Sequence, residues 1–320
     1  MNPKGDFTAE ARLLWISGIA VGIGALCAVV AWLLQRLIYF FTNIFYYQHL
    51  SFEPHRHLWE QATTLGVWAI LIPVLGGLLV GLMARYGSER IRGHGIPEAL
   101  EAILIGRSRM SPKVAILKPL SSAISIGSGG PFGAEGPIIM TGGACGSIIA
   151  QVFQLTAAER KTLLVAGAAG GMTATFGTPV AAVLLAVELL LFEWKPRSLF
   201  PVAVACAMAL TVRPGLGLEN PPLFPIPPHR AVDMLGMASA AVVGLLAGVF
   251  ALFLTLAVYT WEDLFHRLPF HWMWWPALGG LAIGVGGYFQ PRALGVGYDI
   301  IEDLLKGDFE VKILVPLILV

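Results

Sequence analysis

Eleven residues near the middle of the chain decide how it folds: Gly127-Ser-Gly-Gly-Pro-Phe-Gly-Ala-Glu-Gly-Pro137. Within residues 114–158, Glu135 and Lys118 are the only charged side chains. A carboxylate in so apolar a stretch costs several kcal/mol unless polar groups compensate it. The glycines and the closing proline indicate a turn into a helix, whose first backbone N–H groups and positive dipole end attract negative charge. The stretch therefore predicts either an anion site or a glutamate that only caps its helix.

The composition indicates a membrane protein. Of the 320 residues, 56% are apolar and only 13% are charged, with a mean hydropathy of +0.74. A soluble globular domain carries about 25% charged residues, so this class is excluded, and so is disorder. A net charge of +1 gives no basic face for nucleic acid. Cys27, Cys145 and Cys206 lie in apolar runs without metal-ligand spacing, so we expect neither a disulfide framework nor a zinc site.

Apolar segments that are long enough to cross or enter a bilayer recur along the chain. Several are shorter than the ~20 residues of a straight crossing, and others are interrupted by glycine and proline. Broken segments at membrane depth are tolerated only inside protein or around an aqueous cavity, which favours a transporter or channel. We expect an all-α polytopic membrane protein with segments at 13–47, 65–84, 114–126, 136–155, 162–192, 199–212, 233–262 and 272–289.

The distribution of basic residues predicts the orientation in the membrane. Cytoplasmic loops carry an excess of Lys and Arg, and here the loop 47–63 holds Arg56 alone. We therefore expect the N-terminus in the cytoplasm, this loop outside, and the protein in the plasma (inner) membrane. The cytoplasmic cluster consists of Arg85, Arg90, Arg92, Arg107, Arg109 and Lys113.

Two parts of the chain have related sequences. Pro73-Val-Leu-Gly-Gly77 matches Pro276-Ala-Leu-Gly-Gly280 at an offset of 203, and Gly93-His-Gly95 matches Gly295-Val-Gly297 at an offset of 202. Internal repeats with shared glycines are typical of transporters. The six prolines of 213–230 indicate a linker between the copies. We expect a first transmembrane repeat at 1–212, a linker at 213–232 and a partial second repeat at 233–320.

A second motif, Gly93-His-Gly-Ile-Pro-Glu98, opens another short helix. Here too, glycines precede a helix start with a proline in its first turn. Two such N-termini in one half predict that both converge on one dehydrated anion. His94 is compatible with a contact to that anion and, equally, with a purely structural role.

Together these motifs resemble the CLC family of chloride channels and proton-coupled chloride antiporters. Gly93–Glu98 is similar to the G-S-G-I-P helix start of the family, and Gly133–Pro137 is similar to its G-R-E-G-P motif. Lys118 matches a lysine of the family, and the stretch 176–188 looks like its F-N-x-P helix that ends in a glutamate. The resemblance covers nearly the whole chain. It implies an inverted-repeat fold with broken helices, and a homodimer with one pore per subunit.

The resemblance also implies roles for single residues. Glu135 matches the external gating glutamate, which competes with chloride for its site. His94 stands where the family has the serine at the central chloride, and Ala134 replaces the motif arginine, so fluoride and nitrate preference stay open. Chloride is the implied ligand, and no cofactor is implied. The expected anion-binding residues are Gly93, His94, Gly95, Ile96, Pro97, Gly133, Ala134, Glu135, Gly136 and Pro137, supported by Ser128, Lys118 and Glu188.

Proton coupling is the main alternative within this resemblance. Glu188 takes the place of a structural glutamate and Leu189 that of the proton-relay residue. Because leucine carries no proton, the sequence favours a channel over a proton-coupled chloride or fluoride antiporter, without excluding the latter. Glu193 could replace the relay residue, but we expect it to be an interfacial charge paired with Lys195.

Two interpretations outside this family fit the sequence less well. An intramembrane serine protease would use Ser128 as nucleophile and His94 as base, but this leaves Glu135 and the repeat unexplained. A membrane protein that acts only as a scaffold, without transport, would have no need for a glutamate among glycines in an apolar segment.

The repeat also predicts that the second copy is incomplete. By the offset of 202, Val320 corresponds to Lys118, so the counterpart of 127–137 would lie beyond the last residue. In the family that part supplies a third motif and a late tyrosine. We expect residues 1–320 to insert into a membrane but not to conduct selectively.

Overall fold

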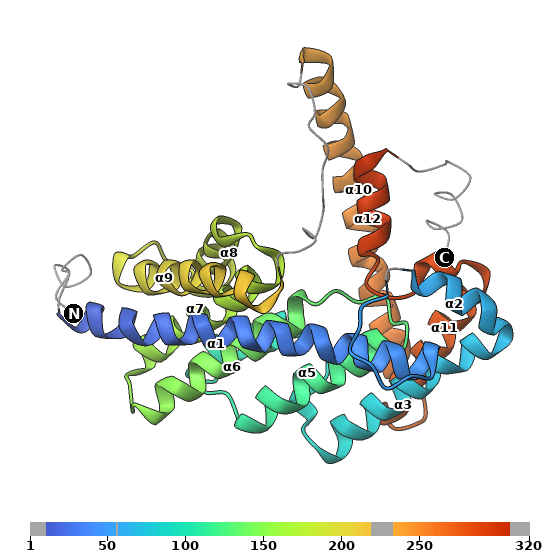
Figure 1. Ribbon diagram of the computed structural model, residues 1–320, viewed down its shortest axis with the longest axis horizontal. Helices are drawn as coiled ribbons and strands as arrows, with labels where there is room; N and C mark the ends of the chain where they lie inside the picture. Colours follow the sequence, from blue (N-terminus) through green and yellow to red (C-terminus); the bar gives the residue numbers. More distant parts are fainter. Residues whose placement is uncertain (1–10, 56, 219–232, 308–320) are drawn as a thin grey trace.

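The computed structural model describes residues 11–55, 57–218 and 233–307. The expectations for the N-terminal start, for Arg56, for most of the proline-rich linker and for the final apolar run concern residues outside these ranges. Every described element is helical (Figure 1). Three helical segments are long and apolar enough to cross a membrane: Ala11–Tyr47, Leu58–Tyr86 and Met234–His266.

Each predicted apolar segment coincides with one or two helices. Short π-helical turns at Asn43–Tyr47 and Ala186–Leu191 extend α1 and α8, and the described part of the linker forms a single 3-10 turn at Pro214–Leu216. The helices are α1 (Ala11–Thr42), α2 (Leu58–Leu65), α3 (Leu71–Tyr86), α4 (Ile96–Leu104), α5 (Pro112–Gly127), α6 (Glu135–Val152), α7 (Ala157–Phe176), α8 (Pro179–Leu185), α9 (Pro196–Val212), α10 (Met234–His266), α11 (Trp275–Phe289) and α12 (Tyr298–Lys306).

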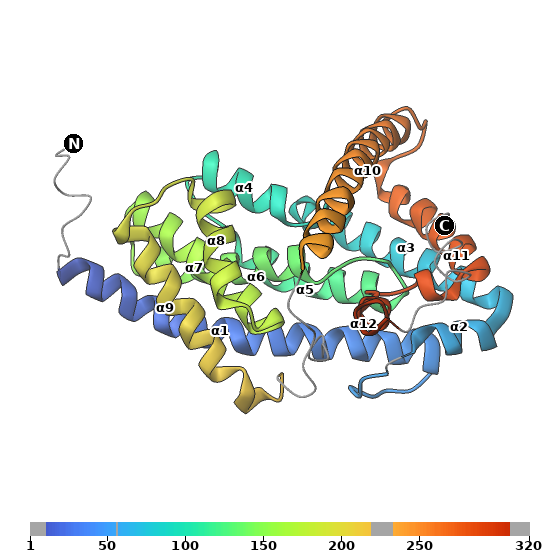
Figure 2. The same cartoon turned by 90° about the horizontal axis from the view of Figure 1, so that it is seen from above.

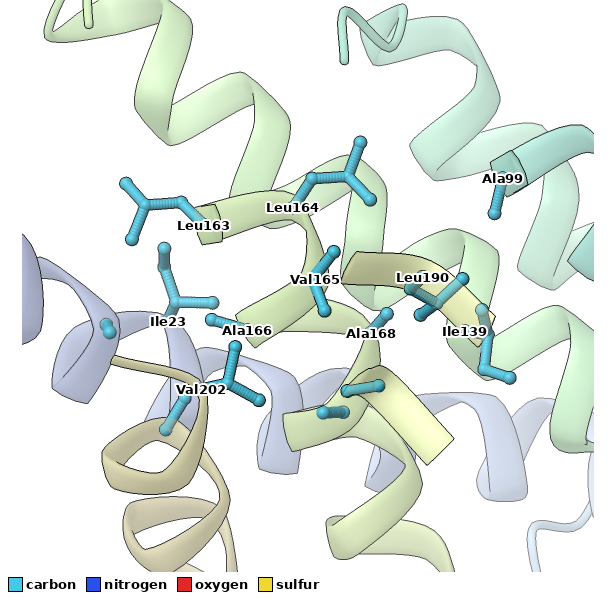
Figure 3. Close-up of a cluster of buried hydrophobic side chains, with 14 of the residues drawn as sticks. Ile23, Ala99, Ile139, Leu163, Leu164, Val165, Ala166, Ala168, Leu190 and Val202 are labelled. Atoms are coloured by element: carbon cyan, nitrogen blue, oxygen red, sulfur yellow. The ribbon is translucent and has the colours of Figure 1, made fainter. Parts of the chain in front are cut away.

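The core lies around α7, which packs between α6, α1 and α9 (Figure 3). Its central side chains, Leu163 to Ala166, are fully buried against Ile23 of α1 and Val202 of α9. Small residues let the backbones approach closely, because a Cβ atom on Gly142 of α6 would overlap the carbonyl oxygen of Gly167 of α7. Close packing of small residues is how membrane helices associate without a strong hydrophobic driving force.

The apolar segment predicted over 162–192 is divided into two helices. Helix α7 ends at Phe176 and α8 begins at Pro179. Gly177 adopts the left-handed conformation with φ +71°, and its N–H donates to the carbonyl of Thr173. A left-handed glycine followed by a proline at a first helical position ends one helix and starts the next.

Helices from the two predicted repeats meet at one end of the bundle. Helix α3 packs against α11 there (Figure 2). Helix α10 behaves differently, since it projects away from the other helices and none of its residues is buried (Figure 1). Its counterpart in the first repeat, α1, is covered by α5, α6, α7 and α9.

Candidate functional site

The glycine-rich loop between α5 and α6 wraps back over the end of α5. The N–H of Gly130 donates to the carbonyl of Ser125 at 3.1 Å, and the N–H of Ser128 donates to the carbonyl of Ile124 at 2.9 Å. The Ser128 hydroxyl also donates to Ser125 O, at 3.0 Å, and lies against Gly76 of α3. Ser128 therefore supports the loop through its own helix, with its hydroxyl directed toward α3.

Glu135 is the first residue of α6, and its carboxyl group is folded back over the loop. A Cβ atom on Gly133 would overlap the Glu135 carboxylate oxygen Oε2, so only glycine leaves room for this conformation. The adjacent residue, Ala134, is buried. The first N–H groups of a helix have no partner within the helix, and here a carboxylate lies at that end.

The start of α4 is held by two polar side chains. The carboxylate of Glu98 accepts a hydrogen bond from the Gly95 N–H at 2.7 Å, which caps the helix. The buried ammonium group of Lys118 donates to the carbonyls of Ile91 at 3.1 Å and Gly93 at 2.7 Å. Lys118 is thus engaged with the loop that carries His94, and it fixes that loop to α5.

The two predicted motifs come together in space. A Cβ atom on Gly95, where φ is +116°, would overlap the carbonyl oxygen of Gly136. A Cβ atom on Gly136 would in turn overlap the carbonyl oxygen of His94 and lie 2.6 Å from its ring nitrogen Nδ1. The glycines are needed because the start of α4 touches the start of α6 without intervening side chains.

A cavity of about 440 Å³ opens beside this contact, and we call it the His94 cavity. Gly93, His94 and Lys118 line it together with Gly133 and Pro137, so residues of both motifs share one space. Its lining includes a cation–π contact between the two predicted repeats, in which the Arg92 guanidinium lies 4.2 Å from the ring centre of Trp272.

Two acidic residues of the α8–α9 region lie away from this cavity. Glu188 is exposed on the π-helical turn that follows α8, next to Leu189, which is 40% exposed. Glu193 accepts a hydrogen bond from the Ser198 hydroxyl at 2.8 Å, and its carboxylate lies 3.6 Å from the Lys195 ammonium group. The expectation that Glu193 pairs with Lys195 is confirmed.

The start of α12 is the part of the site that sequence reasoning missed. The N–H of Gly295 donates to the carbonyl of Gly129 at 3.0 Å, which docks this segment on the glycine-rich loop. Tyr298 is the first residue of α12 and follows this docked segment. The signal that could have found it is the repeat itself, because Gly295-Val-Gly297 precedes a helix just as Gly93-His-Gly95 does.

A second cavity, of about 910 Å³, lies between α1, residues 53–55 and α12, and we call it the Tyr39 cavity. Tyr39, Tyr298 and Asp299 are among its lining residues. Ile126, at the end of α5, lines both this cavity and the His94 cavity. The glycine-rich loop that follows Ile126 therefore lies where the two cavities approach each other.

Helices that are broken at glycine- and proline-rich turns, with two N-termini meeting inside an apolar bundle, define a polytopic membrane protein of the transporter and channel type. Residues 76–320 match the model of the family described as "Voltage gated chloride channel". The chain therefore belongs to this family. This membership excludes the serine protease interpretation, because the family consists of channels and transporters.

Relatives and solved structures agree with this family. A ClcB-like chloride channel protein of Ralstonia nicotianae is 30% identical over 250 residues, covering 76% of this chain and 58% of that protein. The voltage-gated ClC-type chloride channel ClcB of Salmonella typhi is also 30% identical over 250 residues, covering 76% of this chain and 59% of that protein. The chain therefore spans less than two thirds of the length of these relatives.

Two solved structures share the fold. A slow cyanobacterial Cl⁻/H⁺ antiporter superposes with a TM-score of 0.78 at 20% identity, covering 97% of this chain and 71% of that one. A CLC-type fluoride/proton antiporter superposes with a TM-score of 0.79 at 19% identity, covering 98% of this chain and 75% of that one. At these identities the likeness shows the fold, and the expected CLC-like arrangement of broken helices is confirmed.

Proposed function

We propose that the complete protein carrying this chain transports chloride across a membrane, with Glu135 as the gate. The observation that carries the proposal is the contact between Gly95 and Gly136, which brings the starts of α4 and α6 together beside one cavity. Both helix N-termini offer N–H groups and a positive dipole end to an anion. Since the Glu135 carboxylate lies at the same helix end, it competes with the anion for that place, and its protonation or displacement opens the path.

The proposed roles follow the contacts of each residue. Backbone groups of 93–97 and 133–137 surround the anion, and the His94 side chain lines its cavity. Lys118 and Ser128 hold the loops on either side of the site through hydrogen bonds to backbone carbonyls. Glu188 has a supporting place near the end of α8. The transported ion itself is the ligand, and no cofactor is part of the proposal.

Proton-coupled antiport of chloride or fluoride is the second candidate function. The titles of the two structural neighbours describe a Cl⁻/H⁺ antiporter and a fluoride/proton antiporter. His94 is compatible with fluoride as the transported anion, because imidazole N–H groups donate hydrogen bonds to anions. Leu189 at the relay position supports the uncoupled alternative.

The assembly and the membrane placement are also proposals. We propose that 1–212 and 233–320 belong to two repeats joined by the linker 213–232, that the protein is a homodimer, and that it lies in the plasma (inner) membrane with its N-terminus in the cytoplasm. Large apolar side chains exposed on α8 and α9 support association with lipid or a second copy, among them Val180 at 73% and Phe200 at 49%. A net charge of +1 gives no support for a nucleic-acid partner.

Anion flux into liposomes tests the proposal. Chloride flux through the reconstituted complete protein should rise as external pH falls, because protonation neutralises the competing carboxylate. Glu135→Gln keeps the shape of the protonated side chain and should give flux nearly independent of pH. Identical pH profiles for the wild type and Glu135→Gln would contradict the gate assignment. Parallel recording of fluoride flux and of pH inside the liposomes separates the two candidate functions.

A further inference from the structure

The end of α1 lies directly on the glycine-rich loop that leads to Glu135. The helix closes with the π-helical turn Asn43–Tyr47, a form that is frequent at functional sites. A Cβ atom on Gly127 would lie 2.6 Å from the Cβ atom of Phe41, which is closer than two such atoms can stand. The loop therefore starts in direct contact with the backbone of α1.

Tyr46, in this turn, is the residue that fixes the loop. Its side chain is fully buried, and its hydroxyl donates a hydrogen bond to the carbonyl of Ser128 at 3.2 Å. A Cβ atom on Gly129, where φ is +94°, would overlap the same hydroxyl oxygen. The carbonyl of Gly129 accepts a hydrogen bond from the Gly295 N–H at 3.0 Å. The phenol thus holds the loop at two successive residues, and the second predicted repeat holds it at one of them.

Few residues separate this anchored part of the loop from Glu135. Beyond Gly129, the Phe132 N–H donates to the carbonyl of Gly130 at 2.8 Å, which folds the chain tightly. The Glu135 carboxylate is folded back over Gly133, where a Cβ atom would overlap it. The position of Gly129 therefore limits where Gly133 can lie beneath the carboxylate.

Tyr46 is itself held from outside the glycine-rich loop. Its carbonyl accepts a hydrogen bond from the Gln61 side chain of α2 at 3.2 Å. Three residues earlier, the Asn43 side chain donates to the carbonyls of Ser51 at 2.9 Å and Glu53 at 3.0 Å. Because these bonds do not involve the phenol, the loss of its hydroxyl should act on the glycine-rich loop rather than on α1.

We propose that Tyr46 is a positioning residue for the gate: its hydroxyl, through the Ser128 carbonyl, holds the glycine-rich loop in the form over which the Glu135 carboxylate closes. This inference rests on the proposed function, since it concerns how the closed gate is maintained. Tyr46 acts through the backbone of the loop, and the anion and the carboxylate remain the groups that exchange at the helix N-terminus.

Removing only the hydroxyl should weaken the closed gate. Tyr46→Phe keeps the buried ring but takes this donor from the Ser128 carbonyl, so the loop gains freedom below Glu135. The charged carboxylate should then lose part of the stabilisation that it has at the helix N-terminus. We expect a several-fold higher chloride flux at pH 7, and half-maximal flux at a higher external pH, by up to about 1 pH unit.

The substitution removes no charge from the surroundings of the loop. At the start of α4 and in the His94 cavity, the charged and titratable groups are Arg92, His94, Glu98 and Lys118. In the Tyr39 cavity, the acidic groups are Glu53, Asp299, Glu302 and Asp303. The other titratable groups there are Arg36, His55, His57, Arg213 and Lys306, with the phenols of Tyr39 and Tyr298. All of them stay in place, so a shifted midpoint reports the position of the loop.

The experiment compares chloride flux against external pH in liposomes for five forms of the complete protein. These are the wild type, Tyr46→Phe, Glu135→Gln, the double variant of both, and the control Tyr47→Phe. Tyr47 belongs to the same π-helical turn, but its hydroxyl lies 3.5 Å from the carbonyl of His57, away from the glycine-rich loop. We expect the shifted midpoint in Tyr46→Phe alone, the wild-type midpoint in Tyr47→Phe, and equal flux for Glu135→Gln and the double variant.

The outcomes separate the two proposals. A wild-type midpoint in Tyr46→Phe, alongside a flat profile in Glu135→Gln, overturns the role of Tyr46 and leaves the gate intact. An equal shift in Tyr47→Phe overturns it too, and so does a flux of the double variant that differs from that of Glu135→Gln, because the hydroxyl then acts on the fold and not through the gate. A wild type without any Glu135-dependent flux removes the proposed function, and the positioning role with it.

Discussion

Gly77 of α3 and Gly280 of α11 make the same contact from opposite sides of one helix crossing. A Cβ atom on Gly77 would overlap the carbonyl oxygen of Pro276, and a Cβ atom on Gly280 would overlap that of Pro73. Both pairs are related by the sequence offset of 203, and so are the contacts of Gly81 with Met273 and of Gly284 with Ile70. The crossing is therefore locally two-fold symmetric, as an inverted repeat requires.

Substitutions at adjacent glycines of α11 should have opposite effects. Gly280→Ala places a methyl group into the Pro73 carbonyl and should destabilise the fold by about 1–3 kcal/mol. Gly279→Ala meets open space and should be neutral or stabilising, by up to about 1 kcal/mol, because alanine is a better helix former. Melting temperatures of the purified variants in detergent measure the difference. Equal melting temperatures would contradict the close crossing.

Lys118 should be a stabilising residue rather than an anion ligand. Lys118→Met keeps the length of the side chain but leaves the buried carbonyls of Ile91 and Gly93 without their donor, at a cost of about 1–3 kcal/mol. Lys113→Met, five residues earlier at an exposed position of α5, serves as the matched control. Thermal unfolding in detergent should separate the two variants. A stable Lys118→Met protein with altered anion selectivity would instead place the ammonium group at the anion.

The local parts of the site could be predicted from the sequence. Glycine and proline restrict their own backbone, so they predict the starts of α4 and α6 without knowledge of the fold. The isolation of Glu135 in an apolar stretch is equally visible in the sequence. Their convergence was also predictable, because two similar anion-binding turns stand in one half of the chain. The division of the apolar segment 162–192 has the same local origin, because Gly177 adopts a left-handed conformation and Pro179 starts the next helix.

Contacts between distant segments could not be predicted in the same way. Nothing in the local sequence indicates that the Ser128 hydroxyl turns toward Gly76, or that Lys118 bonds two carbonyls rather than lining the site as a free charge. The hydrogen bond from Gly295 to Gly129 likewise joins two segments that lie far apart in the sequence. These positions depend on how the two repeats pack, which the periodicity of either one does not specify.

Glu159, at the start of α7, should make stability depend on pH in the acidic range. Its carboxylate accepts hydrogen bonds from the side chain of Arg12 and from Thr156, and these hold its pKa at about 2, against an ordinary value of 4.5. A carboxyl group with a lowered pKa stabilises the folded state above its unfolded pKa. That contribution should therefore be complete at pH 7 and decline as pH falls from about 4.5 toward 2.

The comparison of the wild type with Glu159→Gln measures this contribution. Because Arg12 is largely exposed, solvent screening keeps the contribution of the pair small. The difference in melting temperature should be largest near pH 7 and smaller at pH 3. Glu101→Gln, at an exposed position of α4, should show no such trend. A difference that grows on acidification would contradict the assigned pairing.

His94 should influence which anion passes. Its ring lies over Gly136 and lines the cavity shared by both motifs, so His94→Ser changes the size and charge of the group beside the anion. We expect transport to persist, because the backbone N–H groups of α4 and α6 remain, with a changed ratio of chloride to nitrate or fluoride flux. His49→Ser, in the exposed loop before α2, is the control. Unchanged flux ratios across several anions would leave only a backbone contribution at this position.

Proton coupling should be weak. Leu189 stands at the place that the family resemblance assigns to the proton relay, and leucine has no titratable group. Glu193 is engaged by Ser198 and Lys195, so its carboxylate is held at the α8–α9 junction rather than directed into the His94 cavity. An imposed chloride gradient should therefore drive chloride flux with little stoichiometric proton movement.

Simultaneous chloride and pH recording in liposomes provides the measurement, with Glu193→Gln as the matched variant. Robust uphill proton movement in the wild type, lost in Glu193→Gln, would show that Glu193 carries the proton and that the protein is an antiporter.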